Sequence, residues 1–176
     1  MIENTNRLLI VGCGNPDAGD DSAGLEIIRR LRERGDCGCD LRAEPRPGVD
    51  LLELFSLADV ILFVDAVVSG GAAGTIYLTP LPSKDVEPRA LGSLSSHGWG
   101  IREVLDLANA LRRPVPRLFL LGVEAAAVAC GAPRAAAVEE ALALIVERIS
   151  ALRLLLLTPE VLSSRSFHPN NRSFPG

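Results

Sequence analysis

The sequence is poor in aromatic residues and in lysine. Aromatic side chains make up 4% of the 176 residues, whereas the hydrophobic class as a whole makes up 48%. The core must therefore be packed by Leu, Val, Ile and Ala. Lys84 is the only lysine, and 18 basic against 22 acidic residues give a net charge of -4. This balance offers no polyanion-binding surface, which argues against nucleic acid as a partner.

Cysteine is also scarce. The four cysteines, at positions 13, 37, 39 and 130, are too few and too scattered for a disulfide framework. Cys37 and Cys39 form a C-x-C pair without a second pair downstream, which disfavours a structural zinc site. We expect reduced, partly buried thiols in a cytoplasmic protein.

The sequence has no long uncharged apolar run. The first 14 residues contain one basic residue and an apolar stretch that is too short for a signal peptide. The most apolar late segment, 141–157, is interrupted by Glu147, Arg148 and Arg153. Because a membrane-spanning helix needs about 20 mostly uncharged apolar residues, we interpret this segment as a core helix and expect no membrane association.

Apolar runs and helical spacings alternate along the chain. Continuous apolar runs predict buried strands, and amphipathic spacing predicts helices between them. The connection between the third and fourth predicted strands is short, which suggests a hairpin and antiparallel pairing. Pro133 suits the first turn of the last helix, where its missing N–H is not needed. The predicted strands are 7–13, 39–44, 60–64, 75–78 and 117–123, and the predicted helices are 20–34, 50–57, 100–112 and 133–156.

This alternation predicts the fold class. We expect an α/β protein, a three-layer α/β/α sandwich with a mainly parallel five-stranded sheet and one antiparallel strand. No internal repeat or linker is visible, so residues 1–157 are predicted to form a single domain. Residues 158–176 have the composition of a disordered C-terminal tail.

Ligands of open α/β sheets collect at the carboxyl ends of the strands, where this chain places polar residues. The first such segment, 14–21, has Gly12 and Gly14 after a strand and before a helix, as in a dinucleotide-binding loop. However, Asp17 stands where the third glycine is needed, and no Gly-Lys-Ser/Thr sequence supports a P-loop. Further carboxylates in this loop also disfavour a phosphate ligand.

Each remaining polar residue has an ordinary structural explanation when taken alone. Helix capping and interaction with the helix dipole account for one of Asp20 and Asp21. Asp65 is a possible turn residue at a strand end, and His97 lies beside serines that suit a helix cap. Taken together, Asp21, Asp65 and His97 come from three loops at one edge of the sheet and form a set suited to a borderline divalent metal.

Protease mechanisms based on serine or cysteine fit less well. Ser96 and His97 are adjacent, so their side chains point in different directions, and the G-x-S-x-G motif is absent. A cysteine nucleophile would have to be Cys13, which we expect to point into the core. His168, the other histidine, lies in the predicted tail.

Several segments, in order, resemble the [NiFe]-hydrogenase maturation endopeptidases over about residues 7–150. The first motif is I-V-G-C-G-N at 10–15 with G-D-D-S-A-G at 19–24, and the second is V-D-A at 64–66 with G-T-I at 74–76. The third is S-H-G at 96–98, and L-G-V-E at 121–124 resembles the family's late strand. The loop at 43–48 departs from the family pattern and keeps only Gly48.

The resemblance implies a mixed five-stranded sheet and an endopeptidase that removes the C-terminal extension of a hydrogenase large-subunit precursor after nickel insertion. It implies that Asp21, Asp65 and His97 are catalytic residues that bind nickel supplied by the precursor, with Asp21 the better candidate for general base. Recognition of the metal without catalysis is an alternative role for all three.

Substrate contacts are expected at Gly14, Asn15 and Gly48, and the protein is expected to be a monomer. The alternative function is a non-catalytic chaperone that senses metal loading; a weaker third is a nucleotide-binding domain.

Overall fold

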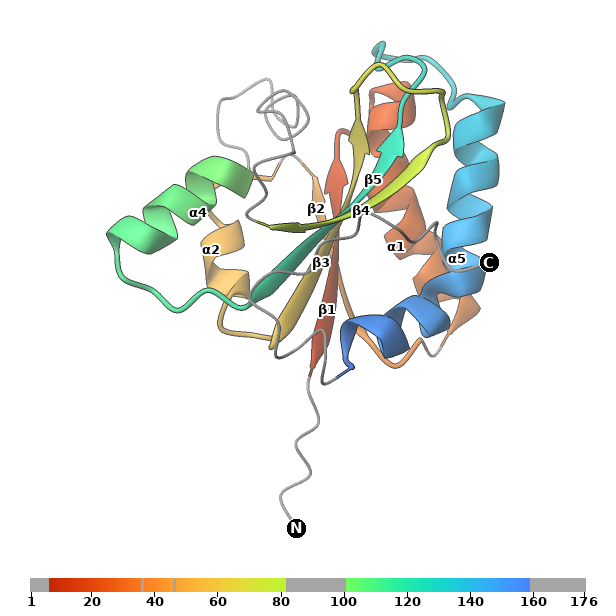
Figure 1. Ribbon diagram of the computed structural model, residues 1–176. Coiled ribbons are helices and arrows are strands. Elements are labelled where there is room, and N and C mark those ends of the chain that lie inside the picture. Colours follow the sequence, from red (N-terminus) through yellow and green to blue (C-terminus); the bar gives the residue numbers. More distant parts are fainter. Residues whose placement is uncertain (1–6, 36, 46, 82–100, 159–176) are drawn as a thin grey trace.

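The computed structural model describes residues 7–35, 37–45, 47–81 and 101–158. Its sheet has the strand order β2-β1-β3-β5-β4. The first four strands in this order run parallel to their neighbours, and the fifth, β4, runs antiparallel to β5 (Figure 1). The strands are β1 (Leu8–Gly14), β2 (Asp40–Pro45), β3 (Val60–Val67), β4 (Ile76–Leu81) and β5 (Arg117–Glu124). The predicted α/β class and the single antiparallel strand are confirmed.

Helices cover both faces of this sheet. α1 (Ala23–Arg34) and α5 (Ala136–Leu156) lie on one face, while α2 (Leu51–Leu54) and α4 (Ile101–Ala110) lie on the other (Figure 1). Side chains alternate along β1: Ile10 belongs to the core under α1 and α5, and Val11 to the core under α2 and α4. The central strands β1 and β3 are buried along their whole length, which explains their continuous apolar sequences.

Two predictions about this architecture are wrong in detail. The antiparallel strand β4 does not form a hairpin with β3, because β5 lies between them and pairs with both. Pro133 is not in the first turn of α5, which begins at Ala136 after the N-cap residue Ala135. The three residues before the helix instead belong to the loop that follows β5.

Further predictions concern the burial of the cysteines, membrane association and the C-terminal tail. Cys13 is fully buried, as expected, and belongs to the core under α2 and α4. Cys37 and Cys39 are partly buried, but Cys130 is exposed, contrary to the expectation of partly buried thiols. Within the described ranges, no helix has the length and hydropathy needed to span a membrane. Of the predicted tail, 158–176, the structure describes only Thr158, and residues 159–176 lie outside the described residues.

Candidate active site at the carboxyl edge of the sheet

Glycines at the end of β1 and at the start of α1 allow α1 to lie directly on the sheet. A Cβ atom at Gly12 would come within 2.1 Å of the Gly24 carbonyl oxygen, and one at Gly24 within 2.1 Å of the Val64 carbonyl oxygen. Gly14 has a φ of +140°, and a Cβ there would lie 1.9 Å from the Asp21 carbonyl oxygen. These glycines are therefore needed for close helix–sheet contact, which explains a glycine pattern that resembles a nucleotide-binding loop.

This close contact brings Asp21 to the end of β3. Asp21 lies in the short 3-10 helix η1 (Gly19–Ser22), which packs against β3. Its carbonyl accepts a hydrogen bond from the Asn15 N–H (3.1 Å), and its own N–H donates to the Ala18 carbonyl (2.9 Å). The side chain is half-buried, and this burial raises the pKa of Asp21 despite the opposing effect of the Asn15 N–H. The carboxyl group thus remains accessible yet binds a proton more readily than usual.

Asp65 lies in β3 itself and has no solvent exposure. Its Oδ1 accepts a hydrogen bond from the Ala66 N–H (2.7 Å), whereas its Oδ2 is buried without a partner among the described residues. Burial raises the pKa of Asp65 well above its usual range, and the nearby charge of Asp21 raises it further. Since a buried carboxylate oxygen normally has a partner, this unpartnered atom beside a second carboxylate fits a proton or a cation as its ligand.

The structure brings Asp21 near enough to Asp65 for its charge to act on that carboxyl group, and a shared role for the two residues stays a prediction. His97 lies outside the described residues, so its place relative to the pair remains a prediction. Within the described part of the chain, no three His, Cys, Asp or Glu side chains are grouped as a metal site would require.

The predicted substrate-contacting residues lie at the same edge of the sheet. Gly14 pairs with Pro45, the last residue of the neighbouring parallel strand β2. Gly48 follows Pro45 by three residues, so it lies just beyond the same end of the sheet. The Asn15 Oδ1 accepts a hydrogen bond from the Asp17 N–H (3.1 Å), which closes an Asx turn. A Cβ atom at Gly48 would meet nothing within 4 Å, so the space around it is open.

Asp20 has a structural role other than the predicted helix capping. Neither Asp20 nor Asp21 makes a capping hydrogen bond to its own helix. Instead, the buried Asp20 carboxylate accepts hydrogen bonds from the N–H groups of Ala126 (2.8 Å), Ala127 (3.0 Å) and Ala135 (2.7 Å). It thereby ties η1 to the loop between β5 and α5. Of the two adjacent aspartates, Asp20 is thus used by the fold, and Asp21 stays the candidate for chemistry.

The first prediction separates these two aspartates. We expect Asp20→Asn to lower the free energy of unfolding by about 2–4 kcal/mol, because the amide puts an NH₂ group against backbone donors and removes a charge that they solvate. Asp21→Asn in the same loop is the matched control and should leave the free energy of unfolding unchanged or slightly raised. Urea titration followed by circular dichroism measures both, and equal destabilisation of the two variants would contradict the assignment.

Glu124 is a buried residue whose role was not anticipated from the sequence. Its carboxylate accepts hydrogen bonds from the Ser69 hydroxyl (2.6 Å) and from the N–H groups of Ser69 (2.8 Å), Gly70 (2.9 Å) and Gly71 (3.2 Å). Burial acts to raise the pKa of Glu124, but these donors outweigh it, so the pKa is lowered. Glu124 thus holds the loop that follows β3. A glutamate ending an apolar strand was the only signal for it.

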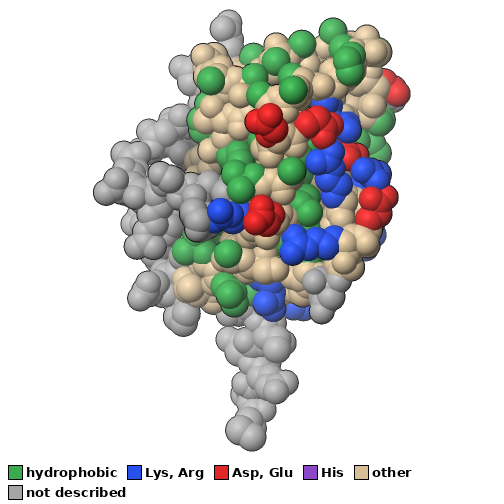
Figure 2. Space-filling model, turned by 90° about the vertical axis from the view of Figure 1, so that its right-hand side faces the viewer, with side chains coloured by type: hydrophobic (Ala, Val, Ile, Leu, Met, Phe, Trp, Pro, Cys, Tyr) green, Lys and Arg blue, Asp and Glu red, His purple; other side chains and the backbone are tan. Residues whose placement is uncertain are grey.

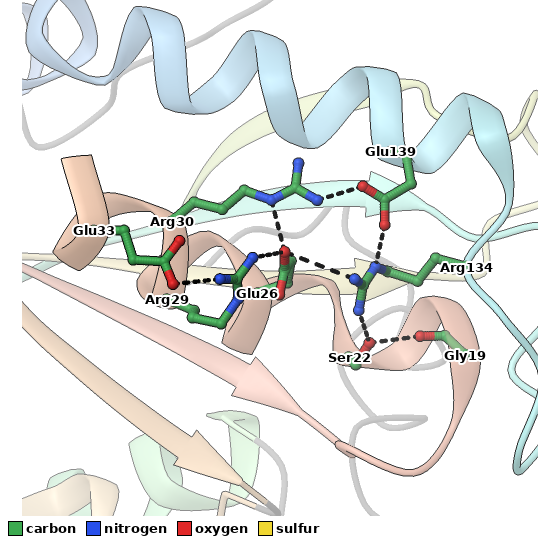
Figure 3. Close-up of polar contacts among 8 residues, drawn as sticks. All are labelled: Gly19, Ser22, Glu26, Arg29, Arg30, Glu33, Arg134 and Glu139. Carbon is green, nitrogen blue, oxygen red and sulfur yellow. Dashed lines mark hydrogen bonds and ion pairs between the residues drawn. The ribbon is translucent and has the colours of Figure 1, made fainter.

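An ionic network fixes the start of α1 against α5. Arg30 pairs with both Glu26 (2.7 Å) and Glu139, and Arg134 reaches Glu139 (2.6 Å) and the Ser22 hydroxyl (2.8 Å) (Figure 3). Hydrogen bonds from Arg29 above all, and from Arg30, lower the pKa of Glu26 to about 2. Figure 2 shows acidic and basic side chains close together on this side of the molecule. The network thereby holds α1 in place, and with it η1, which directly precedes α1 and packs against β3.

Comparison with known proteins places this geometry in context. The solution structure of an endopeptidase from Escherichia coli is 24% identical, with a TM-score of 0.68, and the match covers 85% of this chain and 93% of that one. The hydrogenase maturating endopeptidase HybD from E. coli is 23% identical, with a TM-score of 0.64 and the same coverage. The [NiFe] hydrogenase maturation protease HycI from Thermococcus kodakarensis KOD1 is 22% identical, with a TM-score of 0.63, covering 85% and 94%. These likenesses establish a shared fold.

The family follows from the sequence itself. None of the curated proteins matches this chain. The model of the HycI hydrogenase maturation proteases matches residues 47–152, which is more than half of the chain. The matched region contains Asp65 and His97, together with strands β3, β4 and β5. The chain belongs to the hydrogenase maturation protease family and is a hydrolase of the endopeptidase type.

Proposed function

We propose that this protease removes the C-terminal extension of a [NiFe]-hydrogenase large-subunit precursor once nickel has been inserted. In this proposal, Asp21, Asp65 and His97 contact the nickel that the precursor carries. The observation that carries the proposal is the buried Asp65 Oδ2, which has no partner among the described residues and lies beside the second carboxylate, Asp21. Oxygen and nitrogen ligands suit a borderline divalent ion, and such an ion would remove the repulsion between the carboxylates.

The two carboxylates are suited to different tasks. Asp65 is completely buried on a central strand, so its position is rigid and it can orient what binds beside it. Asp21 is half-buried in the short 3-10 helix η1 and can reach both solvent and substrate. Its raised pKa brings it nearer to the working range of a general base, and we assign it the removal of a proton from the attacking water. The nickel, when bound, polarises the scissile carbonyl.

The surrounding edge of the sheet supplies the proposed substrate contacts. Gly14 and Asn15 share a loop with Asp21, and Gly48 follows the neighbouring strand with open space around it. We assign these three positions to the backbone of the precursor near the cleavage site. We also assign the protein to the cytoplasm, because its four cysteines are too few and too scattered for the disulfide framework of a secreted protein.

The second prediction tests metal-dependent recognition. Purified protease mixed with nickel-loaded precursor should release the C-terminal peptide, whereas nickel-free precursor should remain intact. His97→Ala should reduce cleavage of the loaded precursor by about 10²-fold or more, because one nickel contact is lost. Mass spectrometry of the released peptide measures both results. Equal cleavage of the two precursors, or full activity of His97→Ala, would refute the proposal.

A further inference from the structure

The C-x-C pair between α1 and β2 forms a compact dithiol. The Cys37 Sγ lies 3.8 Å from the Cys39 carbonyl oxygen, and the Cys39 Sγ lies 3.4 Å from the Cys37 carbonyl oxygen, in reciprocal weak hydrogen bonds. Gly38 between them has a φ of +65°, which folds the segment into a turn. Both cysteines are partly buried against the core under α1 and α5. Their thiols therefore face a shared, partly apolar space.

Arg153 of α5 covers this turn. A Cβ atom at Gly38 would lie 3.3 Å from both the Cζ and the Nε of Arg153, so the guanidinium group lies close against the turn. The Arg153 Nε is buried and has no hydrogen-bond partner among the described residues. A cationic group with an unused donor therefore lies against the turn that joins the two cysteines, and its charge acts on the Cys39 thiol. Such a group stabilises a thiolate formed beneath it.

The spacing of the two cysteines permits a disulfide. Residues two apart have Cα atoms at most about 7 Å apart, and the turn at Gly38 shortens this distance. A disulfide requires Cα atoms about 4.4–6.8 Å apart. We propose that Cys37 and Cys39 form a thiol–disulfide exchange site beneath Arg153, which reacts with small-molecule disulfides of the glutathione class.

The exchange consists of two balanced steps. The Cys37 thiolate attacks one sulfur of the small disulfide, forms a mixed disulfide and releases one thiolate that takes up a proton. The Cys39 thiol then gives its proton to solvent, and its thiolate attacks the Cys37 Sγ and releases the second small thiol. Two protein thiols are oxidised, and one small disulfide is reduced to two thiols.

Burial makes the second step the slow one at neutral pH. In the reduced pair, burial, followed by the nearby charge of Cys37, raises the pKa of Cys39 to about 12, although Arg153 opposes this shift. The charge of Cys37 is lost in the mixed disulfide, but burial, the largest cause, remains. A neutral disulfide has no such charge to bury and fits the apolar surroundings better than two thiolates do. The site lies at the end of the sheet where β2 begins, opposite the edge that holds Asp21 and Asp65 (Figure 1).

The third prediction concerns the products of oxidation. After incubation of the full chain with glutathione disulfide, alkylation and tryptic digestion, the peptide 35–42, which contains both cysteines, should be two hydrogen atoms lighter and unlabelled. The exposed Cys130, in a separate peptide, should carry a glutathione adduct and serves as the internal comparison. Free thiols at Cys37 and Cys39, or a glutathione on each, would overturn the proposal.

Two variants test the roles within the pair. In Cys39→Ser, the glutathione adduct on Cys37 should persist, because the resolving thiol is missing. Arg153→Met should slow disulfide formation several-fold, whereas Arg148→Met on the same helix should not. Thermal melting of each variant reports whether it is folded. Loss of the adduct in Cys39→Ser, or equal rates for the two arginine variants, would contradict the mechanism.

Discussion

Asp65→Asn is expected to reduce cleavage of the nickel-loaded precursor by about 10²–10⁴-fold while raising the melting temperature of the protease. The amide has nearly the same shape as the carboxyl group, and its oxygen can still accept the hydrogen bond from the Ala66 N–H. It cannot, however, provide the negative charge at the buried Oδ2 position. Activity should be lost because, in the proposed function, this charge contacts the nickel of the precursor. Stability should be gained because a charge at this position is costly to bury.

The gain in stability should depend on pH with a defined sign. The pKa of Asp65 is raised in the folded state, mainly by burial and then by Asp21, so the folded chain holds this proton more tightly than the unfolded chain does. The stability that this provides is complete below the unfolded pKa of about 4 and is lost as the pH rises toward the folded pKa. The amide side chain of the variant does not titrate, so the difference in melting temperature between variant and parent should grow as the pH rises above about 4.

Cleavage assays and thermal melting between about pH 4 and pH 8 measure the two effects. Asp21→Asn should show the same loss of cleavage with a smaller gain in stability, because Asp21 is only half-buried. Asp40→Asn is the matched control, since Asp40 is exposed at the start of β2, at the opposite end of the sheet. A stability difference independent of pH, or an active Asp65→Asn enzyme, would contradict the assignment of Asp65.

Gly24→Ala is expected to have the largest effect on folding and to lower the free energy of unfolding by more than about 3 kcal/mol. The added methyl group would lie 2.1 Å from the Val64 carbonyl oxygen and 2.4 Å from the Cys13 carbonyl oxygen. Both atoms belong to the backbone of buried central strands, so neither can move aside. α1 would have to shift away from the sheet and take η1 with it.

Urea titration compares this variant with Gly48→Ala, in which the same methyl group enters open space. We expect Gly48→Ala to change the free energy of unfolding by no more than about 0.5 kcal/mol. An unchanged urea midpoint for Gly24→Ala would show that the contact between α1 and the sheet can relax. The same result would weaken the structural explanation of the glycines at the end of β1 and at the start of α1.

The sequence predicts those parts of the fold that depend on local pattern. β1, β3 and β5 are buried on both faces and therefore appear as continuous apolar runs. The neighbour of β4 could not be predicted in this way, because it depends on β5 entering the sheet later in the chain. A short connection from β3 indicates the direction of β4 but not which strand it joins.

The candidate site shows the same division between local and distant information. Asp21 and Asp65 could be found because polar residues at the carboxyl ends of strands lie at a common edge. The division of roles between Asp20 and Asp21 could not be found, because the partners of Asp20 lie 106–115 residues away in the chain. The role of Glu124 was missed for a similar reason, since the groups that donate hydrogen bonds to it follow β3, far from Glu124 in the sequence.

The close seating of α1 on the sheet also determines when the carboxylate pair loses its freedom of movement. Asp65 is part of a central strand, and the main chain of Asp21 is hydrogen-bonded to Asn15 and Ala18. The entropy cost of holding these two groups near each other is therefore met when the chain folds, not when the precursor arrives. Binding energy from the precursor remains available to place the scissile bond.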